Sequence, residues 1–338
     1  MSFRFDPAGP AQPPRRRFMA FGAGLLSASC MPLAAMAQSN YPSRPIRIVV
    51  GFAAGGLTDS LPRLLSQPLS EILGQPVVIE NKPGAGGNIA ASAVLAAPAD
   101  GHTVLMCTTG ILSIQPFLYK KLPFDPERDI APVTQIANAP YLLLVNAALP
   151  VKNVAELISY AKQHPGELNF ASSGNGTGGH LAGEMLKSKA GVNMVHVAYK
   201  GTGTAMADVL SGQVGIIFDQ PVSSMPNVTA GTLRALAIAS PRRLPSLPNL
   251  PTVSESGVPD FDPVTWTGLC ASKNTPQAAI DRLQQEVAKV IALPEINKRL
   301  VQDGLEPVGS KPEDFRRFLA ADKRKWGNVV QQAGIVAE

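Results

Sequence analysis

The chain has 338 residues, of which 45% are hydrophobic, 6% aromatic and 16% charged, and its formal net charge is +5. At ~150 residues per domain this length predicts about two domains, each able to bury a core. The charged fraction is below the usual ~25%, and Gly and Pro recur without a period, which excludes a disordered chain, a coiled coil and a collagen-like chain. Residues 1–37 hold four arginines against one aspartate, so the remaining chain is nearly neutral and nucleic-acid binding is not expected.

The N-terminus has the pattern of an export signal. Arg15, Arg16 and Arg17 precede an uncharged stretch from residue 20 to Ala37, which ends in the A-x-A sequence Ala-Met-Ala. The basic run is twin-arginine-like, although Pro14 replaces the usual serine, so general secretory export stays open. A membrane anchor and a lipoprotein at Cys30 are weaker alternatives. We expect cleavage near Ala37 and a periplasmic protein.

The first part of the mature chain alternates strand and helix signals. Short β-branched runs predict strands, and leucines at helical spacing predict the helices between them. The expected strands are 46–50, 77–79 and 103–107, and the expected helices are 61–73 and 89–95.

The same order returns after residue 140. The expected strands are 141–145, 169–171, 195–197, 214–218, 233–238 and 264–271, and the expected helices are 154–161, 180–189, 205–210, 278–291 and 312–332. Such alternation predicts an α/β fold in which mostly parallel sheets are flanked by helices. Two halves of this kind would place a ligand at the carboxyl ends of the strands.

The sequence offers little support for catalysis or metal binding. It lacks the phosphate-loop, zinc-protease and nucleophile-elbow motifs, and its four histidines have no metal-ligand spacing. We therefore expect no metal, no cofactor and no enzyme activity. Cys107 and Cys270 would remain after signal cleavage and are either two buried thiols or one disulfide.

Two glycine-rich loops, 51–59 and 173–179, each lie between an expected strand and a helix. Glycine lets backbone N–H groups approach a ligand, and a helix N-terminus adds free donors and the positive end of its dipole. Thr58, Ser173 and Thr177 add hydroxyl groups. Such loops can bind a carboxylate without Arg or Lys. The alternative is a pair of ordinary turns, with Asp59 as a helix cap.

The second loop also satisfies the dinucleotide pattern G-x-G-x-x-G over residues 174–179. The following strand should then end in an acidic residue that binds the ribose, but residues 195–200 contain none. Lys200 could instead bind a 2′-phosphate, which keeps an exported dinucleotide-dependent enzyme as a weaker alternative.

The chain resembles the Bug-type extracytoplasmic receptors of tripartite tricarboxylate transporters. The shared motifs are YPSRPI at 41–46, GFAAGGLTD at 51–59, VIENKPGAGG at 78–87, SSGNGT at 172–177, AYKG at 198–201 and LPTVSESG at 250–257. The first loop departs from the family's Pro-Gly-Gly-Pro, since Ala54 and Leu57 occupy the proline positions. The resemblance implies a two-domain periplasmic-binding-protein clamshell, with domain 1 at 41–139 plus 262–338 and domain 2 at 140–261.

The resemblance also implies a ligand site between the two glycine loops. Its expected residues are Phe52, Ala53, Gly55, Gly56, Thr58, Asp59, Thr108, Thr109, Ser173, Gly174, Thr177, His180 and Asp219. Asp219 follows an expected strand and either accepts a hydrogen bond from the ligand or caps a helix.

The implied function is binding rather than catalysis. A monomeric receptor would capture a di- or tricarboxylate, an acidic amino acid or an aromatic acid and present it to a membrane permease. An orphan or sensor-linked receptor that feeds no transporter is the alternative.

Overall fold

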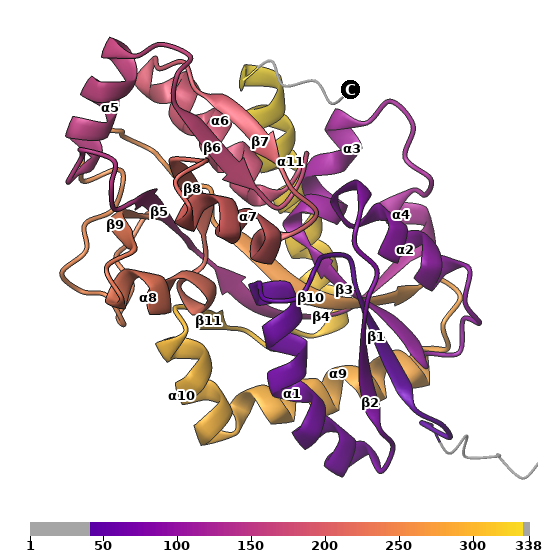
Figure 1. The fold of residues 1–338 in the computed structure, drawn as a ribbon. Coiled ribbons are helices and arrows are strands. Elements are labelled where there is room, and N and C mark those ends of the chain that lie inside the picture. Colours follow the sequence, from indigo (N-terminus) through magenta and orange to yellow (C-terminus); the bar gives the residue numbers. More distant parts are fainter. Residues whose placement is uncertain (1–40, 334–338) are drawn as a thin grey trace, which may run out of the picture. The chain divides into compact units, whose positions relative to one another are not determined.

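The computed structural model describes residues 41–333, which form two mixed β-sheets flanked by helices (Figure 1). The expected signal peptide lies outside the described residues. Between residues 41 and 333, no helix has both the length and the apolar content needed to cross a membrane.

The first sheet has six strands in the order β11-β4-β10-β3-β1-β2. Its strands are β1 (Ile46–Val50), β2 (Val77–Asn81), β3 (Thr103–Thr108), β4 (Ile130–Ala139), β10 (Thr265–Ser272) and β11 (Glu306–Pro307). The helical elements of this part are α1 (Leu57–Leu73), η1 (Ala85–Gly87), α2 (Asn88–Leu95), η2 (Gly110–Ile114), α3 (Gln115–Leu118), α4 (Pro126–Asp129), α9 (Gln277–Ala292), α10 (Pro294–Gln302) and α11 (Pro312–Ala333).

The second sheet has five strands in the order β7-β6-β8-β5-β9. Its strands are β5 (Tyr141–Asn146), β6 (Asn169–Ser172), β7 (Val195–Ala198), β8 (Ile216–Asp219) and β9 (Leu233–Ala239). Its helices are α5 (Val154–Gln163), α6 (Gly178–Ala190), α7 (Thr202–Leu210) and α8 (Pro221–Thr229).

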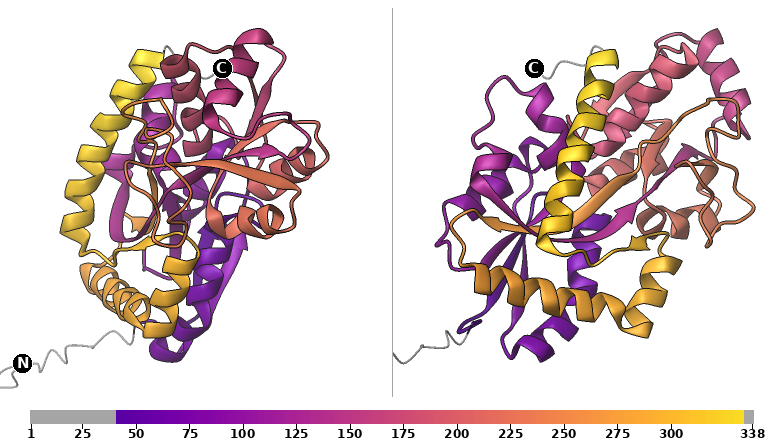
Figure 2. Two further views of the ribbon diagram at one scale, coloured as in Figure 1. Left: turned by 90° about the vertical axis from the view of Figure 1, so that its left-hand side faces the viewer. Right: turned by 180° about the vertical axis from the view of Figure 1, so that it is seen from behind.

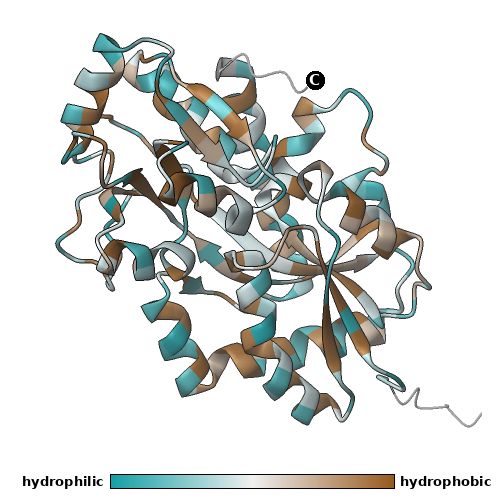
Figure 3. Ribbon diagram, viewed as in Figure 1, coloured by the Kyte–Doolittle hydropathy of each residue, from teal (hydrophilic) through white to brown (hydrophobic). Residues whose placement is uncertain are grey.

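The central strands of both sheets are buried on two faces, which explains their continuous apolar runs, whereas the edge strands β2 and β7 are partly exposed. In β5, Leu143 and Val145 pack in one cluster with residues of α5 and α6, whereas Leu142 and Leu144 pack in another with residues of α7. This alternation follows from the two-residue repeat of a strand. Figure 3 shows the apolar character of β1 and β5 and the mixed surfaces of the helices.

The predicted two-domain α/β fold is confirmed, but the sheets are mixed rather than mostly parallel. β1 pairs in parallel with β2 and β3, whereas β10 runs antiparallel to both β3 and β4. β10 follows a long connection from the second sheet, so it is not bound by the direction that a β-α-β crossover imposes. The domain boundaries at 139/140 and 261/262 remain a prediction.

The C-terminal helix α11 contacts both parts of the fold. It packs against β4 and η2, and also against α6. A small apolar cluster joins them, in which Leu118 lies with Leu181 of α6 and with Trp326 and Val330 of α11. Seen from behind, α11 runs between the elements of the two sheets (Figure 2).

Sequence patterns missed the strand β4 and the helices α8 and α10. Pro132 interrupts the apolar run of β4, and a proline normally argues against a central strand. The structure accommodates it at an irregularity, because the register of β10 passes from Thr134 to Pro132 and skips Val133. Pro294 begins α10, where its fixed φ suits the first helical position.

The two cysteines are buried neighbours. Cys107 of β3 and Cys270 of β10 are free, and their Sγ atoms lie 2.6 Å apart. Burial raises the pKa of the Cys107 thiol well above its usual value.

Candidate functional site

A cavity of about 50 Å³ lies where the glycine loops of the two domains meet. No charged residue of the described chain lines it, so any ligand charge must be balanced by dipoles and neutral hydrogen-bond donors. Its lining residues are Phe52, Leu57, Thr58, Thr108, Thr109, Gly110, Tyr141, Ser173, Thr177, Gly178, Gly179, Thr202, Phe218, Gln220, Thr265, Trp266 and Thr267.

The first glycine loop brings the N-terminus of α1 to the cavity. Gly55 has a φ of +100°, a conformation that favours glycine, and Gly56 is the extended N-cap of α1 with no side-chain cap. Phe52 and Thr58 line the cavity, whereas Ala53, Gly55 and Gly56 shape the loop without lining it. The first N–H groups of α1 are therefore available as donors.

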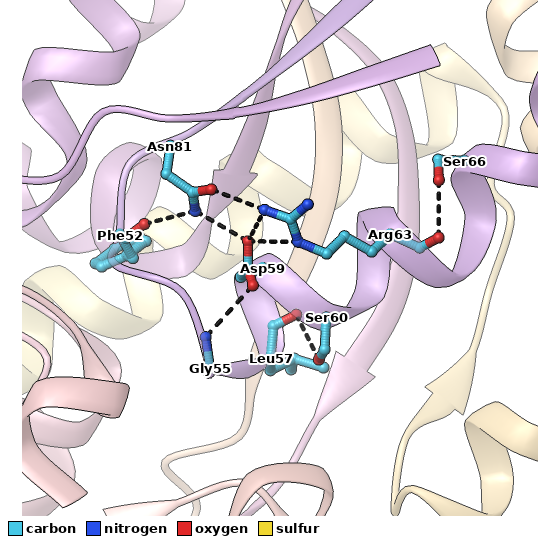
Figure 4. A network of polar contacts seen from close by, with 8 residues as sticks. All are labelled: Phe52, Gly55, Leu57, Asp59, Ser60, Arg63, Ser66 and Asn81. Carbon is cyan, nitrogen blue, oxygen red and sulfur yellow. Dashed lines mark hydrogen bonds and ion pairs between the residues drawn. The ribbon is translucent and has the colours of Figure 1, made fainter. Parts of the chain in front are cut away.

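Asp59 holds this loop in place and does not line the cavity. Its carboxylate accepts hydrogen bonds from Gly55 N at 3.3 Å and Asn81 Nδ2 at 3.0 Å, and pairs with Arg63 at 2.8 Å (Figure 4). Asn81 also donates to Phe52 O at 3.0 Å. Burial raises the pKa of Asp59, but the hydrogen bonds from Arg63, Asn81 and Gly55 outweigh it and hold the pKa below its usual value. The ionised carboxylate thus ties α1, β2 and the loop together.

The second glycine loop brings the N-terminus of α6 to the same cavity. Gly174 and Gly176 have φ values of 138° and 71°. Thr177, the N-cap, donates its hydroxyl hydrogen to Gly174 O at 2.7 Å, so this hydroxyl stabilises the loop and has no hydrogen left for a ligand. Ser173, Thr177, Gly178 and Gly179 line the cavity, whereas Gly174 does not.

His180 supports the second loop from behind. Its Nδ1 accepts a hydrogen bond from Gly176 N at 3.2 Å, and its ring stacks on His196 at 3.9 Å between centroids. Burial, helped by the charges of His196 and Lys187, lowers the pKa of His180 to about 3. Burial, with Lys187, also lowers the pKa of His196 to about 4. Both rings are therefore neutral at pH 7, and His180 does not line the cavity.

The N-terminus of a third helix, α7, also lies at the cavity and contacts the first glycine loop. Ala53 N donates to Lys200 O at 3.2 Å, which joins the first glycine loop to the loop before α7. A Cβ on Gly203 would lie 2.2 Å from Ala54 O, so glycine is required for this contact. Thr202 reaches the cavity from the first turn of α7. The N-termini of α1, α6 and α7 thus converge on one cavity.

The ends of β3 and β10 form another wall. Thr108 and Thr109 lie there, as the sequence predicts, and Thr109 Oγ1 accepts a hydrogen bond from Trp266 N at 2.8 Å. Thr265, Trp266 and Thr267 were missed, although polar residues alternate in this otherwise apolar strand. Sequence reasoning also missed the lining residues Tyr141, Phe218 and Gln220, which come from β5, β8 and the N-cap of α8.

Asp219 lies beside the cavity rather than in its wall. Its Oδ2 accepts a 2.5 Å hydrogen bond from the Ser223 hydroxyl in the first turn of α8. The helix-capping alternative is wrong, because Gln220 is the N-cap of α8 and no side chain caps this helix. Burial raises the pKa of Asp219 to about 7, against the lowering effect of the hydrogen bonds from Ser223 and Gln220. In residues 41–333, no three His, Cys, Asp or Glu side chains are grouped as metal ligands.

Comparisons with known proteins agree with this architecture. Residues 61–335 match the family described as tripartite tricarboxylate transporter family receptor. A solved structure titled R. palustris Rpa4515 with adipate is 40% identical, covers 88% of this chain and 99% of its own, and has a TM-score of 0.86. The periplasmic binding protein BugD is 34% identical, with 88% and 100% covered and a TM-score of 0.84. MatC from Rhodopseudomonas palustris with bound malate is 33% identical, with 86% and 100% covered and a TM-score of 0.82.

Proposed function

The chain belongs to the tripartite tricarboxylate transporter receptor family, and on this premise we propose that it captures a small organic carboxylate in the periplasm for a membrane permease. The chain is accordingly a solute-binding receptor and not an enzyme. The proposal covers three points: the chemical class of the ligand, the delivery to a membrane permease and the export to the periplasm.

One observation carries the carboxylate assignment: three helix N-termini meet at a cavity that no charged side chain of residues 41–333 lines. Free N–H groups and the positive ends of helix dipoles attract an anion there. We assign the carboxylate to the first turns of α1 and α6, with Thr58 and Ser173 as hydroxyl partners. Asp59 and His180, which were also expected in the site, act indirectly by holding the two loops.

The relatives support a short dicarboxylate within this class. Two of them are solved structures with adipate and with bound malate, and this chain covers both relatives nearly completely. The aromatic side chains of the wall, Phe52, Tyr141, Phe218 and Trp266, would enclose the carbon chain of the acid. Lys200 does not line the cavity, which leaves the dinucleotide alternative without its phosphate-binding residue.

Calorimetric titration with a carboxylate panel and the matching methyl esters tests this proposal. The panel contains succinate, malate, glutarate, adipate, glutamate, benzoate and nicotinate. At least one acid should bind with one molecule per chain, and its ester should bind about 10-fold or more weakly, because a lost hydrogen bond to a charged group costs about 1.5–3 kcal/mol. Equal affinity for every acid and its ester would contradict the assignment.

Export is tested separately by N-terminal sequencing of the protein from a periplasmic extract. Cleavage after Ala37 should give a chain that begins at Gln38. A chain that retains residues 1–37 and fractionates with membranes would favour the anchor alternative.

A further inference from the structure

Three of the threonine hydroxyls that line the cavity are already used by the fold. Thr109 Oγ1 accepts from Trp266 N at 2.8 Å, Thr177 donates to Gly174 O at 2.7 Å, and Thr265 donates to Ala139 O at 2.9 Å. These hydroxyls therefore stabilise loops and strand ends.

Thr108 and Thr267 differ from them. They lie directly opposite each other on the antiparallel strands β3 and β10, and both line the cavity. Thr108 is 9% exposed and Thr267 is 3% exposed, yet neither Oγ1 has a hydrogen-bond partner in the described chain. Buried polar atoms are nearly always hydrogen-bonded, and leaving one without a partner destabilises the fold, so two facing unpartnered hydroxyls in one wall need an explanation.

We propose that Thr108 and Thr267 bind a second oxygen-bearing group of the ligand, at the opposite end from the carboxylate held by the glycine loops. This inference rests on the proposed function. The shared chemistry is an oxygen that accepts hydrogen bonds, either of a second carboxylate or of a terminal hydroxyl.

The position of Thr108 and Thr267 favours a short acid with two oxygen-bearing ends as the ligand. Gly178 of α6 lies against Thr265, since a Cβ on Gly178 would be 2.3 Å from Thr265 Cγ2. Thr267 lies two residues further along β10, which is about 7 Å. The threonine pair is therefore separated from the N-terminus of α6 by the length of a short carbon chain. Two opposed hydroxyls can donate to the two oxygens of a carboxylate, or one can donate to a ligand hydroxyl while the other accepts from it.

The test uses probes that differ only at the far end. Calorimetry compares adipate, 6-hydroxyhexanoate and hexanoate, and also succinate with butyrate, on the wild type, Thr108→Val and Thr267→Val. At least one bifunctional acid should bind about 10-fold more tightly than its monocarboxylate of equal length. Each valine variant should remove most of that advantage and leave the affinity for the monocarboxylate within about 2-fold. Comparison of adipate with 6-hydroxyhexanoate distinguishes a carboxylate from a hydroxyl.

Thr103→Val is the matched control. Thr103 is a buried threonine of the same strand, but its hydroxyl accepts from Arg47 and it does not line the cavity. This variant should keep the advantage of the bifunctional acids and lose some stability. Thr267→Val should instead leave the ligand-free protein as stable as the wild type or more so, because it removes an unpartnered hydroxyl while keeping the shape.

Two results would overturn the inference: no bifunctional acid binds more tightly than its monocarboxylate, or the advantage survives in both valine variants. An ordered water alone would then explain the orphaned hydroxyls. These results are distinct from failure of the proposed function, in which no acid of the panel binds more tightly than its ester.

Discussion

Gly178→Val should weaken carboxylate binding roughly 150-fold while the ligand-free protein keeps its fold. A Cβ at this position would lie 2.3 Å from Thr265 Cγ2 and 2.8 Å from Tyr141 Oη, closer than non-bonded atoms approach. Gly178 begins α6 in the second domain, whereas Thr265 begins β10 of the first sheet. Overpacking of this kind costs up to about 3 kcal/mol, which is about 150-fold in Kd.

The clash should act mainly on the approach of the domains, because the shorter of the two contacts is with Thr265 of the first sheet. A small separation of α6 from β10 relieves the contact with Thr265, and Tyr141 meets the new side chain only through its ring edge and hydroxyl. The free energy of unfolding without ligand should fall by less than the binding free energy, and the part that is lost comes from Tyr141, which belongs to the core of the second sheet. Calorimetry with the tightest-binding acid of the panel measures the affinity, and urea denaturation measures the stability.

Gly215→Ala is the control for this prediction. Gly215 also belongs to the second domain, and its added Cβ would approach other atoms no closer than 3.9 Å, outside the cavity. This variant should bind like the wild type. If Gly178→Val also bound like the wild type, the close approach of α6 to β10 would not be needed for ligand binding.

The sequence predicted the glycine loops because their signal is local. A strand, a glycine-rich turn and a helix follow one another within about a dozen residues, and both predicted loops reach the cavity in the structure. The resemblance to family motifs then predicted the family, which is confirmed.

The roles of individual residues within the loops could not be predicted in the same way. Asp59 and Thr177 are polar residues of the two glycine loops, but their partners are Arg63, Asn81 and the backbone of Gly174. Whether a polar atom is free for a ligand depends on these partners, which spacing along the chain does not determine.

The wall formed by β3 and β10 was predicted only in part, since its strands are far apart in the sequence. Thr108 and Thr267 are separated by more than 150 residues and become neighbours only through the strand register. The mixed direction of the sheet has the same origin, because β10 returns from the second sheet and inserts between β3 and β4. Such long-range pairing follows from the whole fold and not from any local pattern.

Acidification should destabilise the protein through His180, by about 2 kcal/mol between pH 6.5 and pH 5. The folded state keeps this ring neutral, because burial lowers its pKa from 6.5 to about 3. The unfolded chain takes up a proton once the pH falls below 6.5, so proton uptake favours unfolding throughout the window from pH 6.5 to about 3. The slope for one such group is about 1.4 kcal/mol per pH unit.

His180→Asn isolates this effect, because the Asn Oδ1 can accept the hydrogen bond from Gly176 N that Nδ1 now accepts, and Asn does not titrate. The stability of the wild type relative to this variant should therefore fall as the pH is lowered from 7 to 5.

Asp219 has the opposite effect on the free energy of unfolding. Its raised pKa, about 7, means that the folded state binds the proton more tightly than the unfolded chain, so acidification stabilises the protein through this group. Asp219 is present in both proteins, so its effect cancels in the difference between them. His164→Asn, which replaces a half-exposed histidine outside the glycine loops, is the control and should follow the wild type. Urea denaturation at pH 7, 6 and 5 measures the three curves. If the stability of the wild type and of His180→Asn changed in parallel with pH, His180 would take up its proton as readily in the folded protein as in the unfolded chain. A protonated Nδ1 cannot accept the hydrogen bond from Gly176 N, so this bond would then not support the second glycine loop.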